Sequence, residues 1–264
     1  MDVKERSLLS GDANVRRHPW ELARLDVVRT LVRRCLRILP NRSDVVLDIG
    51  CGDAFVVQAL AREYPAWRFV AMDLAFDHEM IATLRQQTVV PNLEYRRGLD
   101  FSAEPGKRPA LVLMLDLLEH VQDDAAFLRE IVEGGTAAPE SVILITVPAM
   151  RFLFSSHDVL LNHRRRYELR TLKQTVSGSG LAVTESGYFF ASLALARVAG
   201  VLFEKLFARK PTPWRGIAGW RGGALVTSLA KRLLLLDFGF CQVLKTFGVQ
   251  VPGLSCYVIC QGRQ

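Results

Sequence analysis

The stretch over residues 45–54 constrains the fold of this chain more than any other. Its apolar residues end in Asp48, a Gly-x-Gly turn at Gly50 and Gly52 follows, and residues 54–64 are compatible with a helix. A buried parallel strand that feeds such a turn lets the backbone approach a ligand closely, because glycine has no side chain in the way. We therefore expect a strand, a turn and a helix that together form part of a ligand site.

A second apolar run, residues 68–72, ends in Asp73, which lies twenty-five residues after Asp48. An acid at the tip of the second strand is where nucleoside-binding α/β folds hold the ribose hydroxyls. Gly-x-Gly alone is weak evidence, but it becomes strong when two strands and two acids accompany it. This order of motifs resembles the first two motifs of the class I S-adenosylmethionine-dependent methyltransferases.

A dinucleotide-binding fold is the rival interpretation of the same pattern. A pyrophosphate needs a third small residue so that the helix N-terminus can close on it, and Phe55 stands at that place. Asp53 would also bring a carboxylate next to any phosphate. S-adenosylmethionine has no phosphate, so both residues favour a methyltransferase over a nicotinamide enzyme.

Apolar strands alternate with helices along most of the chain. We expect strands at 45–49, 68–72, 93–97, 110–115, 141–147, 181–189 and 254–260, and helices at 15–39, 54–64, 76–87, 123–134 and 168–177. Such alternation indicates a parallel sheet covered on both faces. We predict an α/β, Rossmann-like fold with a seven-stranded, mostly parallel sheet, an antiparallel last strand, an N-terminal helix and a C-terminal helical insertion. The predicted parts are 1–43 (N-terminal helical cap), 44–190 (cofactor-binding core), 191–250 (basic amphipathic helical insertion) and 251–264 (final strand of the core).

The resemblance implies a set of residues that contact S-adenosylmethionine at the strand tips. They are Asp48, Gly50, Cys51, Gly52, Asp73, Leu74, Asp100, Phe101, Asp116 and Leu117. In the family, an acid at the place of Asp100 accepts from the adenine amino group and its apolar neighbour packs on the ring; a simple turn cap is the alternative for Asp100. Leu117 is expected to face the adenine, and Cys51 to be a small filler in the turn.

Glu119 and His120 follow Asp116 and are expected to point toward the acceptor. Two carboxylates and an imidazole can hold a divalent cation. A similar acid-x-x-Glu-His run occurs in ubiquinone-pathway O-methyltransferases, where such an ion is implied. The Glu-His pair also occurs in methyltransferases without metal, so we predict no metal and keep Asp116, Glu119 and His120 as the alternative site.

A polar segment follows the fifth strand, where this fold places its substrate lid. Its pattern, Ser-x-His-Asp and then His-x-Arg-Arg-Tyr, resembles a subgroup of small bacterial methyltransferases linked to glycan or isoprenoid-lipid metabolism. We assign the catalytic base to His120 or His157, because an imidazole with a pKa near 6.5 suits a hydroxyl acceptor at neutral pH. Substrate contacts are expected from Glu119, Asp158, His163, Arg166 and Tyr167. The alternative is a solvated basic loop in front of a helix.

Residues 191–250 combine basic charge with leucine. They contain nine Lys or Arg and two acids, Glu204 and Asp237. Their leucines form helical stripes, Leu195–Leu206 and Leu225–Leu236, which either pack on the core or on another subunit, or lie on an anionic membrane surface with tryptophan at the headgroup boundary. We predict the membrane surface, and this much leucine argues against nucleic acid.

The composition also predicts where the protein is found. The first forty residues carry charges throughout, unlike a signal peptide, and no uncharged run forms the apolar helix of roughly 20 residues that spans a bilayer. Five cysteines without CxxC spacing fit reduced thiols. We predict a cytoplasmic protein, with a peripheral position on the inner face of the membrane as the finer expectation.

The predicted activity is methyl transfer from S-adenosylmethionine to an oxygen of an apolar or lipid- or glycan-linked small acceptor at the membrane surface. The chain lacks the Asp/Asn-Pro-Pro-aromatic signature of amino-methylating nucleic-acid enzymes and a Pro-Cys or Thr-Cys nucleophile for pyrimidine C5. Three alternatives stay open: a non-catalytic partner subunit that retains the cofactor pocket, a cofactor sensor, and a soluble methyltransferase whose insertion is a dimer interface. The oligomeric state is not predicted.

Overall fold

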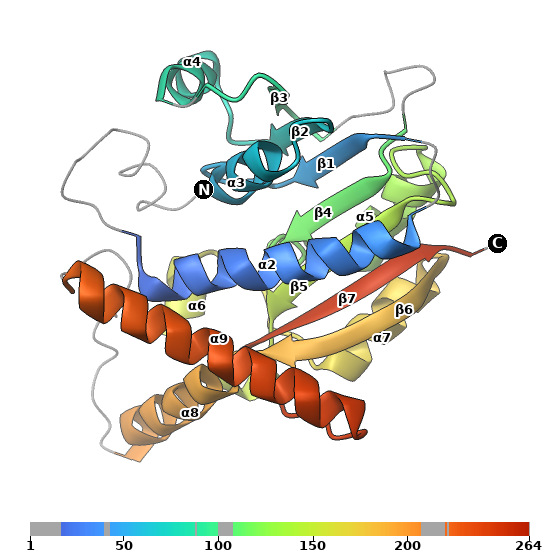
Figure 1. The fold of residues 1–264 in the computed structure, drawn as a ribbon. Coiled ribbons are helices and arrows are strands. Elements are labelled where there is room, and N and C mark those ends of the chain that lie inside the picture. The colour runs from blue at the N-terminus through green and yellow to red at the C-terminus, as the bar shows by residue number, and fades with distance from the viewer. Residues whose placement is uncertain are drawn as a thin grey trace.

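The computed structural model describes residues 17–39, 43–87, 89–99, 108–206, 220 and 222–263. Within them a seven-stranded sheet has the order β3-β2-β1-β4-β5-β7-β6 (Figure 1). Strand β7 pairs in antiparallel orientation with β5 and β6, whereas β1 to β5 pair in parallel. The predicted fold class, a mostly parallel Rossmann-like sheet with an antiparallel last strand, is therefore confirmed.

Each predicted strand and helix is present within the described residues, with bounds that shift by a few residues. The strands are β1 (Val45–Ile49), β2 (Arg68–Asp73), β3 (Leu93–Arg97), β4 (Leu111–Leu115), β5 (Val142–Pro148), β6 (Leu181–Phe189) and β7 (Ser255–Gly262). The helices are α2 (Pro19–Ile38), α3 (Phe55–Glu63), α4 (His78–Gln87), α5 (Asp124–Glu133), α6 (Ser156–Leu160), α7 (Leu169–Gly178), α8 (Ala191–Leu206), α9 (Ala224–Thr246) and the 3-10 turn η1 (Arg151–Leu153). The sequence did not predict α6, because five residues are too few to show helical periodicity.

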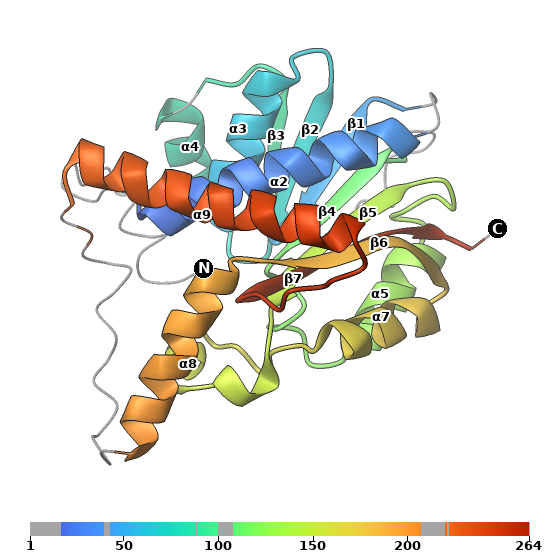
Figure 2. The same cartoon turned by 60° about the horizontal axis from the view of Figure 1, so that its bottom comes forward.

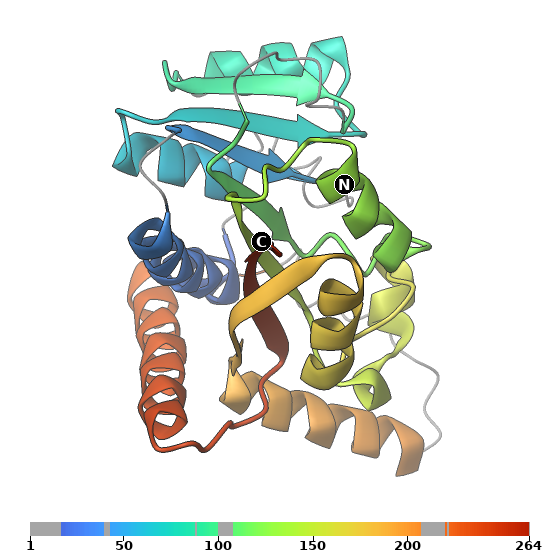
Figure 3. The same ribbon diagram turned by 90° about the vertical axis from the view of Figure 1, so that its right-hand side faces the viewer.

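Helices cover both faces of the sheet and enclose two separate apolar cores (Figure 3). One core joins residues of α2, α3, α4 and α9 to one face, and the other joins α5 and α7 to the opposite face. All residues of β1 and β4 are buried, which explains why these central strands are apolar without alternation. Because β1 and β4 pair in parallel, their carboxyl ends lie side by side in the middle of the sheet.

Helices α2 and α9 lie along each other on one face of the sheet (Figure 2). The Lys231 ammonium is 2.7 Å from the Asp26 carboxylate of α2, and Lys245 is 2.8 Å from Glu185 of β6. Lys231 thus faces α2 and not the outer side of α9. In the described part of the chain, no helix has the length and apolarity to cross a membrane.

Candidate active site

The turn after β1 is built around positive backbone angles. Gly50 and Gly52 have φ of +72° and +57°, a region that favours glycine. A Cβ at Gly50 would lie 2.6 Å from Leu117 Cδ1, so the turn touches the residue that follows the tip of β4. The turn therefore lies against the segment that follows the fourth strand.

Asp73, at the end of β2, is fixed by the backbone around it. One carboxylate oxygen accepts from the Gly52 N–H at 2.9 Å, and the other accepts from the Ala75 N–H at 2.8 Å. Each oxygen keeps a further lone pair, and the side chain is only half-buried. Asp73 therefore presents an oriented carboxylate at the place where a ribose diol is expected. Leu74 beside it is exposed, and Asp100 and Phe101, the predicted adenine contacts, lie outside the described residues.

Asp48 and Cys51 complete the turn. Asp48 is buried, one of its oxygens has no partner within the described structure, and burial raises its pKa to about 7 against the opposing charge of Arg24. A buried carboxylate oxygen without a partner is costly and would be relieved by a cationic ligand group. Burial, together with the neighbouring acids, also raises the pKa of the Cys51 thiol well above its usual range. That shift fits the predicted filler better than a nucleophile.

Two arginines from the N-terminal helical region lie over the strand tips, and sequence reasoning missed both. Arg24 pairs with Asp116 at 2.9 Å, and Arg17 pairs with Asp53 at 2.5 Å. The other Asp116 oxygen accepts from the Thr146 hydroxyl at 2.9 Å. The spacing of seven residues, which is two helical turns, was the available signal, because it puts both cations on one side of the predicted helix.

Glu119 is completely buried, and neither carboxylate oxygen has a partner among the described residues. Burial, with the charge of Asp116 in addition, raises its pKa well above the usual range. Ligand atoms of Glu119, His120 and His163 lie within 4.8 Å of one another. His163 thus joins the Glu-His pair in place of Asp116, whose carboxylate is bonded to Arg24. The prediction that no metal is required stays a prediction.

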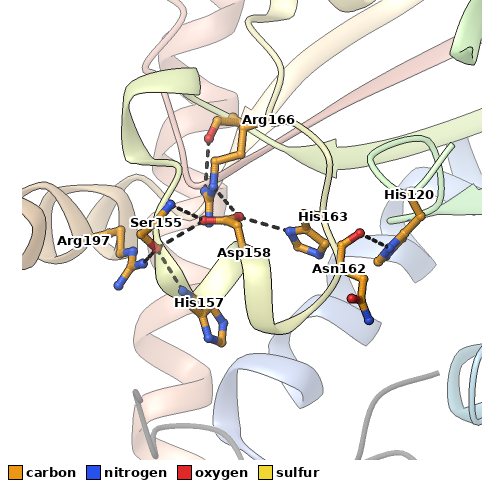
Figure 4. Close-up of polar contacts among 9 residues, drawn as sticks. His120, Ser155, His157, Asp158, Asn162, His163, Arg166 and Arg197 are labelled. Carbon is orange, nitrogen blue, oxygen red and sulfur yellow. Dashed lines mark hydrogen bonds and ion pairs between the residues drawn. The ribbon is translucent and has the colours of Figure 1, made fainter. Parts of the chain in front are cut away.

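Asp158 organises the segment that follows β5 (Figure 4). The same carboxylate oxygen lies 3.0 Å from His163 Nδ1 and 2.7 Å from Arg166 Nε. Burial alone would raise the pKa of Asp158, but the hydrogen bond from His163 and the charge of Arg166 outweigh it and lower this pKa to about 2. Asp158 is therefore ionised at neutral pH, and it orients His163 with Nδ1 as the donor and Nε2 as the acceptor.

The two histidines predicted as catalytic occupy different surroundings. The His120 ring packs edge-on against His163, with centroids 4.9 Å apart, and burial lowers its pKa. His157 lies on the other side of Asp158 from His163 (Figure 4), where burial and the charge of Arg197 lower its pKa. His120 and His163 are therefore brought together, and His157 is not part of that pair.

Arg166 and Tyr167 point into the protein. Arg166 also donates to the Ala149 carbonyl at 3.2 Å, and the Tyr167 hydroxyl lies 2.7 Å from an Asp124 oxygen. Both side chains are buried, and burial together with the Asp124 hydrogen bond raises the pKa of Tyr167. In this geometry they support the segment that carries His163, and direct contact with a substrate stays a prediction.

Comparison with known protein families matches residues 21–186 to the methyltransferase domain family. The chain belongs to this family. S-adenosylmethionine is accordingly the cofactor of this domain, and the predicted cofactor is confirmed.

Two curated relatives cover parts of the methyltransferase. A ubiquinone biosynthesis O-methyltransferase of Azorhizobium caulinodans is 31% identical over 137 residues, which are 49% of this chain and 52% of the relative. A release factor glutamine methyltransferase of Enterococcus faecalis is 30% identical over 88 residues, which are 33% of this chain and 30% of the relative. The chain thus spans about half or less of the length of these relatives.

Solved structures resemble the methyltransferase at the level of the fold. A protein of Galdieria sulphuraria assigned as a sarcosine dimethylglycine methyltransferase has a TM-score of 0.55 at 13% identity, covering 91% of this chain and 85% of that one. Coclaurine N-methyltransferase, bound to N-methylheliamine and SAH, has a TM-score of 0.51 at 15% identity, covering 89% and 70%. The 4+2 cyclase SpnF has the same TM-score of 0.51 at 12% identity, covering 88% and 80%. The fold alone therefore does not define the acceptor.

Proposed function

We propose that this methyltransferase transfers the methyl group of S-adenosylmethionine to an oxygen of an apolar or lipid- or glycan-linked small acceptor at a membrane surface. The observation that carries the proposal is the histidine pair beside the tip of β4, in which Asp158 orients His163 and His163 contacts His120. A hydroxyl acceptor has to lose its proton, and an oriented imidazole is suited to take it near neutral pH. The O-methyltransferase relative supports oxygen as the acceptor atom.

The residues of the cofactor site fit S-adenosylmethionine. In this proposal Asp73 accepts from the ribose hydroxyls and Leu117 packs against the adenine. Their positions at the Gly-x-Gly turn support these roles. The buried, unpartnered oxygen of Asp48 fits the cationic amino group, and Arg24, whose Nε is buried without a partner in the described structure, fits the carboxylate. When bound, this cofactor supplies a methyl group already activated by the sulfonium. The protein then mainly has to align the acceptor, and such alignment can contribute roughly 7–11 kcal/mol.

In this proposal His163 is the base that takes the proton of the acceptor hydroxyl. Because Asp158 accepts from Nδ1, the lone pair on Nε2 is available to the acceptor hydroxyl. The ionised Asp158 also stabilises the imidazolium that forms when His163 takes the proton. His120 lies beside this ring and is the second candidate base.

The apolar character of the acceptor has support near the same segment. Large apolar side chains of η1, of α6 and of the short link between them are exposed: Phe152, Phe154, Val159 and Leu160. An exposed cluster of this kind commonly marks a binding surface. Because these side chains belong to the same segment as His157 and Asp158, they support an apolar acceptor in this proposal.

The proposal is tested by measuring adenosylhomocysteine release with hydroxyl acceptors of increasing apolarity, including phenols and polyprenyl-linked sugars. We expect turnover with at least one apolar hydroxyl compound, and a loss of about 10²–10⁴-fold in His163→Ala. His78→Ala, a change at an exposed histidine at the start of α4, is the matched control and should keep full activity. Product from amines alone would contradict oxygen transfer. Tight cofactor binding without turnover on any acceptor would favour the sensor or partner-subunit alternative.

A further inference from the structure

Helix α9 presents a long apolar face to the outside of the protein. This α9 apolar face comprises Leu225, Leu229, Leu233, Leu236, Phe240, Val243 and Phe247. Their side chains are between 54% and 87% exposed, and steps of three or four residues place them on one side of the helix. From Leu225 to Phe247 the face is about 33 Å long at 1.5 Å per residue. In Figure 2, α9 crosses the front of the molecule as its outermost layer.

The opposite side of α9 fixes this orientation. Leu234, Phe238 and Cys241 are buried against the core, and the ion pairs of Lys231 and Lys245 hold the helix to α2 and β6. The helix therefore cannot turn its apolar face inward without breaking both ion pairs and exposing the buried residues. An exposed apolar surface of this extent is uncommon in proteins that act alone in water and usually marks an interaction surface.

The charge of the sequence in and before α9 indicates what covers the face. Residues 205–236 contain seven Lys or Arg and no Asp or Glu. Arg232 is exposed and borders the apolar face at helical spacing. The one acid of α9, Asp237, accepts from Ser192 at the start of α8. A second copy packed face to face on α9 would bring Arg232 of both copies into one interface, whereas an anionic surface would match this charge.

Trp220 of the predicted membrane surface lies against the N-terminal end of α2. Trp220 packs edge-on against His18, with ring centroids 4.9 Å apart, and donates to the Thr227 hydroxyl at 2.8 Å. Trp220 thus contacts other residues of the protein, and it does not support the expectation of a tryptophan at the headgroup boundary. Trp214, Arg209 and Lys210 lie outside the described residues.

We infer that the α9 apolar face docks on an anionic lipid bilayer with the helix axis parallel to the membrane plane. A helix that is held to the core on one side and apolar on the other can bury its outer side chains at the boundary of headgroups and acyl chains. Leu195 and Leu202 of α8 are also exposed. Docking through the α9 apolar face would bring the protein to a membrane-bound acceptor, and in this purpose it rests on the proposed function. Docking itself requires neither cofactor nor methyl transfer.

The test is flotation of the full chain with vesicles of phosphatidylglycerol and phosphatidylcholine, without cofactor or acceptor. The test variant replaces Leu229, Leu233, Leu236 and Phe240 with Gln, a polar residue of good helix propensity. The matched control replaces Ile38 and Val89, which are exposed apolar residues elsewhere, with Gln. We expect the wild type and the control to float, and the test variant to bind at least a hundredfold more weakly. Circular dichroism and the melting temperature should stay unchanged, because the replaced side chains are exposed.

The charge contribution is tested separately. The triple variant Arg209→Glu, Lys210→Glu, Arg232→Glu leaves Lys231 in place because Lys231 pairs with Asp26. We expect it to bind phosphatidylglycerol vesicles more weakly, and we expect 1 M salt to release the wild type only in part, since salt screens charge and not apolar insertion.

Three results would overturn the inference: no flotation of the wild type, equal flotation of the α9 Gln variant, or equal binding to purely zwitterionic vesicles. A wild-type dimer in sedimentation equilibrium that becomes a monomer in the Gln variant would instead make α9 an interface between copies. Methyl transfer measured on detergent-dispersed acceptor separates the two proposals, because the Gln variant should retain it even if docking fails.

Discussion

Asp73→Ala is the most informative single change at the cofactor site. In the structure both carboxylate oxygens already accept from backbone N–H groups of Gly52 and Ala75, so the side chain is held ready for the ribose. Alanine would remove the two charge-assisted hydrogen bonds expected to the ribose hydroxyls, and it would also loosen the turn at Gly52. Both effects weaken cofactor binding in the same direction.

The magnitude follows from the number of bonds. Hydrogen bonds to a charged group contribute about 1.5–3 kcal/mol each, so two of them amount to about 3–6 kcal/mol. At about 1.4 kcal/mol per factor of ten, the affinity for S-adenosylmethionine should fall by roughly 10²–10⁴-fold. Asp73→Asn keeps the shape and one acceptor oxygen, and we expect a smaller loss of about 10–100-fold from the same arithmetic.

Isothermal titration calorimetry measures this loss directly. Asp44→Ala, which removes an exposed acid just before β1, is the matched control and should bind like the wild type. Circular dichroism should show that the Asp73 variants remain folded. Unchanged affinity in Asp73→Ala, or tighter binding of the wild type to a nicotinamide dinucleotide, would refute the reasoning from the strand tips.

Three further predictions concern pH, the buried acids and metal. Asp48→Asn should gain stability over the wild type as pH rises from about 4 to 7. Burial raises the pKa of Asp48 to about 7, so ionisation of the wild-type side chain opposes folding in this range. Chemical denaturation at several pH values measures the difference, with Asp44→Asn as the control. Asp158→Asn should lower the free energy of unfolding at neutral pH. The difference from the wild type should vanish as pH falls from about 4 toward 2, because the folded-state pKa of Asp158 is about 2 and its carboxylate stabilises the fold only while it is ionised. Methyl transfer should survive chelation with EDTA; abolition with rescue by magnesium or zinc would instead assign a metal to Glu119, His120 and His163.

Much of the cofactor site could be predicted from the sequence because its signals are local. The turn at Gly50 and Gly52 and the acid at the end of β2 are fixed by strand length and backbone conformation, which neighbouring residues determine. The order of the elements could also be predicted, because a strand buried on both faces is a short run of apolar residues that can be recognised in the sequence.

Contacts between distant segments had no such local signal. The pairing of Arg24 with Asp116 joins α2 to the tip of β4, and the pairing of Lys231 with Asp26 joins α9 to α2. From the sequence, His157 was a candidate base because of its residue type and its place in the expected substrate lid. Only the fold showed that Asp158 bonds to His163, five residues further along.

The sequence by itself determined the fold class and the amphipathic character of the C-terminal helices, and the family resemblance of its motifs implied the cofactor. Fold class and amphipathic character depend on residue type and periodicity along one segment, and both can be counted in the chain. The tertiary structure decided which charges are paired, which imidazole is oriented and which side of α9 faces outward. Such properties depend on distances between segments far apart in the chain, and those distances exist only once the helices have packed on the sheet.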